Sequence, residues 1–220
     1  MNSDDMFYHF EILIKRFPAK LTFIWYFVFF LDQRLAKTWG DSFAVKKRKL
    51  PKFLRNEFKR DASFQVEVDG EPGRKLDQDI IDEIVKDAKS CQNGCYQILL
   101  LGGNNIRENE TVQSFILKCF ELSKQFLNLH SNCNLIICGM IPSKKKSSKA
   151  KFKHVDKELR RLANGFLNVT FLKLANDFIN KEGKLKKSLY ADDIHLNDQG
   201  TKILADAIYN HVISWENHGN

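Results

Sequence analysis

The chain has 220 residues, of which 43% are hydrophobic and 28% charged, which is the composition of an ordinary globular protein. A chain of this length buries roughly 70% of the surface that its unfolded form exposes, so collagen-like, fully disordered and disulfide-stapled mini-protein architectures are excluded. Basic residues exceed acidic ones, 35 against 27, and the formal net charge of +8 permits an acidic partner without requiring one.

The segment at 1–39 differs in character from the rest, because it contains the uninterrupted apolar run LTFIWYFVFFL at 21–31. A membrane-spanning helix needs about 20 apolar residues, so this run is too short for an ordinary one. It has the length of a signal-peptide core, although acids precede it and no small-x-small cleavage site follows. An N-terminal signal or membrane anchor at 21–31 and a buried segment both stay open. We expect an atypical N-terminal segment at 1–39 and one domain at 40–220.

From position 40 onward, segments of strand and helix character alternate. Short apolar runs predict strands at 64–68, 96–101, 134–140 and 169–174. Apolar residues at the helical period predict helices at 76–88, 112–127 and 155–162, and a final helix after the capping pair Asn197-Asp198. Because parallel strands need long and usually helical crossovers, this alternation predicts an α/β fold with helices on both faces of a parallel sheet. The chemistry of such folds lies in the loops at the carboxyl ends of the strands.

The five cysteines are an odd number and show no paired Cys-x-x-Cys units that would indicate a zinc site. We interpret them as reduced thiols, because Cys119, Cys133 and Cys138 fall within apolar segments, where cysteine acts as a small hydrophobe. Cys91 and Cys95 flank a Gln-Asn-Gly turn and could pair in an oxidising compartment. Reduced thiols favour an intracellular, cytoplasmic location.

Four short polar segments lie where a predicted strand ends or a helix begins. They are Gly40-Asp41-Ser42, GEPG at 70–73, GGNN at 102–105 and DDIH at 192–195. The phosphate-loop, dinucleotide, His-Glu-x-x-His zinc and Gly-x-Ser-x-Gly motifs are all absent from the sequence. In a doubly wound sheet the four segments could converge on one edge, which would bring a serine, a histidine and an aspartate together.

These residue types suit nucleophilic catalysis. A serine hydroxyl is a weak nucleophile until a base takes its proton, and histidine titrates near neutral pH, so it can take that proton and later protonate the leaving group. Asp192 and His195 are close in sequence, so a turn can set the carboxylate against the far ring nitrogen, and Asp193 is the competing partner. Taken singly, each of these residues could instead be a cap, a turn residue or a structural histidine. The candidate donors to an oxyanion are the amides of Ser42 and Gly73 and the side-chain amide of Asn104.

In this order the four segments resemble the sequence blocks of the SGNH (GDSL-type) hydrolases. Gly40-Asp41-Ser42 resembles the first block with its nucleophile, Gly73 the second-block glycine, Gly102-x-Asn104 the third block and Asp192-x-x-His195 the last. The resemblance runs from Gly40 to the C-terminus. It implies a flavodoxin-like, three-layer α/β/α sandwich around a parallel sheet of about five strands, with no cofactor and no metal. The Gly-Gly-Asn-Asn variant is also similar to esterase domains carried by some retrotransposon proteins.

Two features depart from the family pattern. Asn105 stands where the family usually has aspartate, which bears on the support of the Asn104 loop. The segment before Gly40, DQRLAKTW at 32–39, is mostly polar where the family has a hydrophobic strand. Either the apolar run at 21–31 supplies that strand through an unusual connection, or the start of the domain is aberrant.

Two functional hypotheses follow. The first is a serine esterase that forms an acyl-enzyme on Ser42, with His195 as the base and Asp192 as the residue that orients it. The alternative is a catalytically weak or inactive module of the same fold that binds RNA or anionic lipid through its basic surface. Runs of basic residues are also typical of solvated surface. The residues that would make such contacts are Lys46, Lys47, Arg48, Lys49, Lys144, Lys145 and Lys146.

Overall fold

The computed structural model describes residues 34–41, 49–59, 64–91, 94–129, 133–144 and 149–218. The chain divides into two units, Met1–Gln33 and Arg34–Asn220, and the described residues all belong to the second. The apolar run at 21–31, with its open assignment as signal, anchor or buried segment, lies outside the described residues. Within the described part of the chain, no helix is both long and apolar enough to cross a bilayer.

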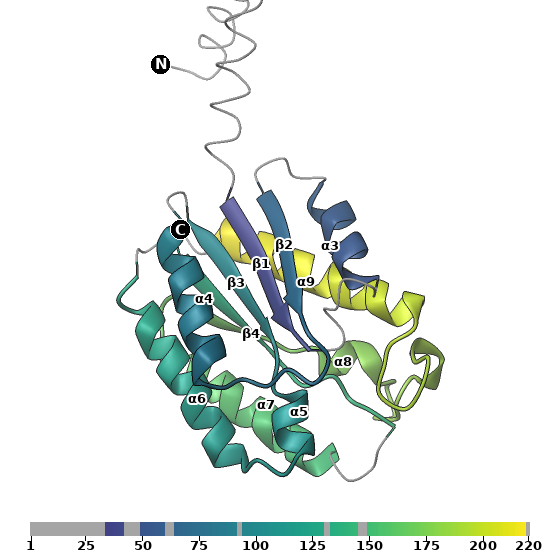
Figure 1. The fold of residues 1–220 in the computed structure, drawn as a ribbon. Coiled ribbons are helices and arrows are strands. Elements are labelled where there is room, and N and C mark those ends of the chain that lie inside the picture. Colours follow the sequence, from purple (N-terminus) through teal and green to yellow (C-terminus); the bar gives the residue numbers. More distant parts are fainter. Residues whose placement is uncertain are drawn as a thin grey trace, which may run out of the picture. The chain divides into compact units, whose positions relative to one another are not determined.

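The centre of the fold is a five-stranded sheet in which every pairing is parallel (Figure 1). The strands are β1 (Arg34–Gly40), β2 (Phe64–Gly70), β3 (Cys95–Leu100), β4 (Cys133–Cys138) and β5 (Val169–Leu172), in the spatial order β2-β1-β3-β4-β5. Every residue of β3 is buried, as expected for a strand covered on both faces. The four strands predicted from apolar runs are confirmed, with small shifts of their boundaries.

Helices cover both faces of the sheet and complete the predicted α/β/α sandwich. One hydrophobic core lies under α3 (Leu50–Phe58) and α9 (Asp198–His218), and the other lies under α4 (Gln78–Ser90), α6 (Val112–Phe126) and α7 (Lys149–Ala163). Short helical segments occur at α5 (Gly103–Arg107), α8 (Ala175–Phe178) and η2 (Lys187–Leu189). The predicted cap of the last helix is confirmed, because Asn197 Oδ1 accepts from the backbone N–H of Gly200 at 3.0 Å.

The mostly polar segment before Gly40 forms β1, between β2 and β3. Other elements supply partners for two of its side chains, whereas the buried Thr38 hydroxyl has no hydrogen-bond partner among the described residues. Lys37 Nζ lies 3.0 Å from Asp87 Oδ2 on α4 and 4.3 Å from the centre of the Trp39 ring. The Trp39 indole N–H donates to Gln97 Oε1 of β3 at 2.6 Å. The segment at 34–40, and not the run at 21–31, therefore supplies this strand, and the sheet begins before the position 40 expected as the domain boundary.

All five cysteines carry free thiols. Cys119, Cys133 and Cys138 are fully buried in the two cores, as expected for cysteines that act as small hydrophobes. Cys91 follows α4 and Cys95 begins β3, and neither forms a disulfide. These thiols lie at the amino end of the sheet, opposite the edge where the polar segments gather.

Candidate active site

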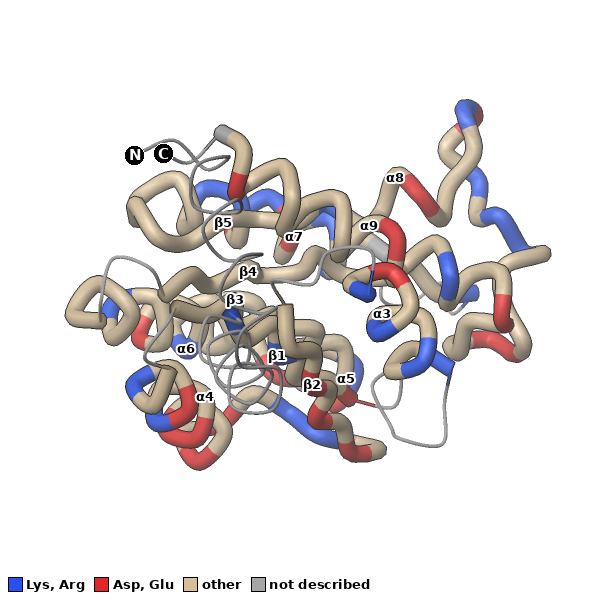
Figure 2. Tube along the Cα trace, turned by 90° about the horizontal axis from the view of Figure 1, so that it is seen from above, with Lys and Arg blue, Asp and Glu red and all other residues tan. Residues whose placement is uncertain are grey.

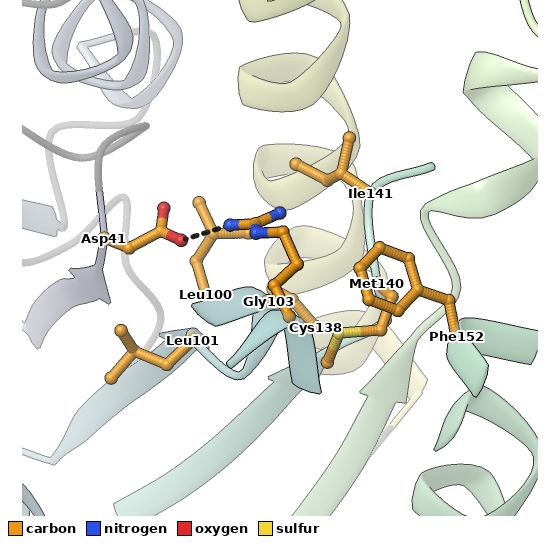
Figure 3. Close-up of a pocket in the computed structure, with 10 residues that line it drawn as sticks. Asp41, Leu100, Leu101, Gly103, Cys138, Met140, Ile141 and Phe152 are labelled. Atoms are coloured by element: carbon orange, nitrogen blue, oxygen red, sulfur yellow. Dashed lines mark ion pairs between the residues drawn. The ribbon is translucent and has the colours of Figure 1, made fainter. Parts of the chain in front are cut away.

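The carboxyl ends of β1, β3 and β4 border a small pocket (Figure 3). Asp41 directly follows β1 and is 2% exposed, which is unusual for a carboxylate. Apolar side chains make up much of the remaining wall. The residues that line the pocket are Asp41, Leu100, Leu101, Gly103, Arg107, Cys138, Gly139, Met140, Ile141 and Phe152. Two of the four polar segments, those at 40–42 and 102–105, thus contribute to one cavity at this edge.

The segment before α9 holds a carboxylate and an imidazole in direct contact. Asp192 Oδ2 lies 2.6 Å from His195 Nδ1, while Asp192 Oδ1 accepts from the backbone N–H groups of Ile194, at 2.8 Å, and His195, at 2.7 Å. The hydrogen bond from the His195 backbone, followed by those from Ile194 and the imidazole, holds the pKa of Asp192 well below its usual range. Since an ionised carboxylate only accepts, Nδ1 carries the shared proton, and Nε2 of the neutral ring is the nitrogen able to take another.

The neighbouring Asp193 binds another loop through its backbone. The carbonyl of Asp193 accepts from the backbone N–H of Lys144 at 2.9 Å, and the Tyr190 hydroxyl donates to the carbonyl of Pro142 at 2.5 Å. These two bonds join the loop after β4, whose first residues line the pocket, to the loop that carries His195. The imidazole is therefore attached to the same edge of the sheet as the pocket.

Asn104, after β3, is held by two arginines. Its Nδ2 donates to the carbonyl of Arg74 at 3.1 Å, and its Oδ1 accepts from Arg107 Nη2 at 2.7 Å. Arg107 Nη2 also lies 3.5 Å from Asp41 Oδ2, the ion pair drawn as a dashed line in Figure 3. Gly73, the other described candidate donor, directly precedes Arg74 in the exposed turn after β2 and has a φ of 79°. The structure thus brings the segments of Asp41, Gly73 and Asn104 together.

Asn105, the departure from the family aspartate, is a buried support of this loop. It is 1% exposed and its side chain is hydrogen-bonded through both Oδ1 and Nδ2. Oδ1 accepts from the backbone N–H of Leu76 at 3.0 Å, while Nδ2 donates to the carbonyl of Leu76 at 3.0 Å and to Glu110 Oε2 at 2.7 Å. The amide therefore fastens the 74–77 loop to the start of α5. An aspartate has no donor for the last two of these contacts.

Ser42 lies outside the described residues, and so do Lys46, Lys47, Arg48, Lys145 and Lys146. The residues on either side of 42–48 are described. Asp41 lines the pocket, and Lys49 forms an ion pair with Asp198, shortly after His195 in the chain. Lys144 contacts the His195 loop through its backbone. Binding of RNA or anionic lipid by these basic residues stays a prediction.

Arg107 is a site residue that sequence reasoning missed. The signal that could have identified it is its spacing, because a residue three positions after Asn104 faces the same side of a helical turn. The contact with Asp41 has no such signal, since the two residues lie far apart in the sequence and meet only in the folded sheet. Among the described residues, no group of three or more His, Cys, Asp or Glu side chains is placed to hold a metal ion.

Known proteins resemble this chain in structure and not in sequence. No family model matches the chain. No curated protein matches it either. A carbohydrate esterase family 3 protein from Talaromyces cellulolyticus superposes with a TM-score of 0.67 at 15% identity, over 83% of this chain and 97% of that one. A GDSL-like lipase from Bacteroides thetaiotaomicron gives 0.66 at 12% identity, over 82% and 88%.

A carbohydrate acetylesterase from Sinorhizobium meliloti gives a TM-score of 0.64 at 17% identity, over 83% of this chain and 99% of that one. These similarities span nearly the whole of each neighbour, so they concern the complete sandwich and not a shared βαβ unit. They agree with the all-parallel five-stranded sheet and its two helical layers. The chain therefore has the fold of the SGNH (GDSL-type) hydrolases.

Proposed function

We propose that this chain is a serine hydrolase that cleaves a carboxylic ester through an acyl-enzyme on Ser42. The observation that carries the proposal is the 2.6 Å contact between Asp192 and His195, in a loop attached to the pocket edge that Asp41 borders. Ser42 is the residue that follows Asp41 in the chain. The fold shared with esterases and lipases adds support from the fold alone.

In the proposed reaction, His195 Nε2 takes the proton from the Ser42 hydroxyl as the oxygen attacks the ester carbonyl carbon. The resulting imidazolium donates that proton to the leaving alcohol, and the acyl group stays on Ser42 until water, activated by the same nitrogen, releases the acid. Asp192 supports both steps, because its lowered pKa keeps it ionised and a negative charge beside Nδ1 stabilises the imidazolium.

The oxyanion would be stabilised by the amides of Ser42 and Gly73 and by Asn104 Nδ2. Asn104 suits this role because Arg107 fixes its Oδ1 and the carbonyl of Arg74 takes only one of its two N–H groups. Its remaining N–H supplies one donor, and one such donor is worth about 3 kcal/mol of transition-state stabilisation. These protein donors would together bind the negative charge that develops on the carbonyl oxygen.

The test is hydrolysis of p-nitrophenyl acetate by the purified chain, with labelling by a fluorophosphonate. Acetate is the first acyl group to try, because one structural neighbour is a carbohydrate acetylesterase. We expect Ser42→Ala and His195→Ala each to lower kcat about 10³-fold or more, and Ser42→Ala to abolish labelling. Ser90→Ala is the matched control, because Ser90 is an exposed serine at the end of α4. Unchanged turnover or labelling in folded Ser42→Ala protein would refute the proposal.

A further inference from the structure

The large hydrophobic side chains that remain exposed in the described part of the chain gather on one surface. They are Leu117, Phe120, Leu127 and Leu167, with 57%, 41%, 51% and 94% of their surface exposed. The first three lie on or just after α6 at spacings of three and seven positions, which places them on one side of the helix. We call these four residues the α6 patch.

Two contacts show that the turn carrying Leu167 belongs to the same surface. The rings of Phe120 and Phe166 lie 5.7 Å apart, edge to face. Asn168 Nδ2 donates to the carbonyl of Phe126, the last residue of α6, at 2.6 Å. Leu167 lies between these two anchored residues and is the most exposed of the four. The α6 patch is thus continuous, and clustered exposed apolar residues of this kind mark contact surfaces.

The α7 side of the α6 patch is strongly basic, whereas α4, which also packs against α6, carries four Asp or Glu and two Lys or Arg. Helix α7 packs beside α6, and Figure 2 shows Lys and Arg along α7. Together the two helices carry eight Lys or Arg and three Asp or Glu, so much of the chain's positive excess is concentrated here. Lys124, Lys157 and Arg161 are all exposed, and Lys124 lies on α6, between Leu117 and Leu127 in the sequence.

This combination fits one kind of partner better than others. A second copy of the chain would bring two positive surfaces together, and like charges across an interface are unfavourable. A bilayer surface accepts separate leucine and phenylalanine side chains without a shaped groove, and anionic headgroups attract the lysines and arginines around them. We propose that the α6 patch, with the basic residues of α7, is a contact surface for anionic membranes. The proposal does not depend on the esterase activity.

The test is partition of the full chain between buffer and vesicles of phosphatidylcholine, with and without phosphatidylserine. We expect Leu117→Ser/Phe120→Ser/Leu167→Ser to lower the partition coefficient about tenfold or more, because exposed apolar side chains no longer enter the interface. We expect Lys157→Gln/Arg161→Gln to lower it about tenfold on vesicles that contain phosphatidylserine and to leave binding to phosphatidylcholine unchanged. Lys181→Gln/Lys184→Gln, in the exposed loop after α8, removes the same charge and should have little effect.

Circular dichroism is the check that each variant is folded. The run at 21–31 is present in all variants, so any contribution from it is constant. Hydrogen exchange on vesicles should show new protection in 112–129 and 164–168. The proposal is overturned if the native chain does not bind vesicles or if the serine variant binds as well as the native chain. It is also overturned if Lys181→Gln/Lys184→Gln lowers binding as much as Lys157→Gln/Arg161→Gln does. Protection confined to other segments overturns it too. A concentration-dependent dimer that the serine variant abolishes without vesicles would assign the surface to a second copy instead.

Discussion

Replacing Asn105 by the aspartate usual in the family should destabilise this chain. The buried carboxylate would still accept from the Leu76 N–H, but it would face the Leu76 carbonyl and the Glu110 carboxylate, the latter from 2.7 Å, with no proton to donate. Each buried acceptor left without a donor costs about 1–3 kcal/mol, although Glu110 keeps its contacts with Lys118 and Ser114. We therefore expect Asn105→Asp to lower the free energy of unfolding by about 2–5 kcal/mol at pH 7, a large part of the stability of a typical domain.

The contribution of this site to the pH dependence of the unfolding free energy should reverse sign in this variant. In the native chain, burial opposes ionisation of Glu110, but hydrogen bonds from Lys118, Asn105 and Ser114 outweigh it and lower the pKa of this carboxyl. Its contribution to stability is present above the unfolded pKa and is lost as pH falls through the lower folded pKa. In Asn105→Asp two carboxylates compete, so one pKa rises above its unfolded value. Stability is then regained as pH falls, because the protonated acid can donate to the other.

The assay is urea unfolding followed by far-ultraviolet circular dichroism at pH 7 and pH 5. Asn105→Asp/Glu110→Gln is the informative control, because the amide introduced at position 110 can donate to the new carboxylate and still accept from Ser114 and Lys118. We expect it to recover about 1.5–3 kcal/mol of the loss at pH 7, the contribution of one restored hydrogen bond to a charged group. An Asn105→Asp chain as stable as the native one at pH 7, or one whose deficit in unfolding free energy relative to the native chain does not shrink between pH 7 and pH 5, would refute the reasoning.

Four further changes test the site and its supports. Asp192→Asn should lower kcat for p-nitrophenyl acetate by about 10²–10⁴ with little change in stability, since the negative charge that orients the imidazole and stabilises the imidazolium is lost; unchanged turnover would contradict this. Arg107→Gln should lower kcat about tenfold with KM nearly constant, because Asn104 loses a positioning bond, and a change in KM alone would argue against it. Gly102→Ala should lower the free energy of unfolding in urea by about 2–4 kcal/mol, because φ is 105° and a Cβ would lie 2.3 Å from the Phe115 ring. Its control is Gly73→Ala, where φ is 79° and no atom lies within 4 Å of the added Cβ, so the free energy of unfolding should fall by about 1 kcal/mol. Equal losses for the two variants would contradict the steric argument. Burial raises the pKa of Asp156 to about 6, so its contribution to the free energy of unfolding becomes more favourable as pH falls through 6. Asp156→Asn should be at least as stable as the native chain at pH 7 in urea unfolding, and it should lack this pH dependence.

The elements that could be predicted from the sequence are those whose signal is local. Apolar runs predicted four strands, because strands of a parallel sheet are covered on both faces. The helical period predicted α4, α6, α7 and α9, because the 3.6-residue turn sets which side chains share a face. The Asp192 and His195 contact is local in the same sense, since a short turn places the two groups side by side. The catalytic role proposed for this pair also requires Ser42, which no local pattern positions.

Tertiary structure decided the rest. The polar sequence of β1 forms a buried strand only because Asp87 and Gln97, far later in the chain, supply partners for Lys37 and Trp39. The pairing of Arg107 with Asp41 and the continuity of the α6 patch with Leu167 likewise join residues distant in sequence. Whether a polar group is stable in a core, or an apolar one stays exposed, depends on what surrounds it in the folded chain, and neighbours along the sequence do not contain that information.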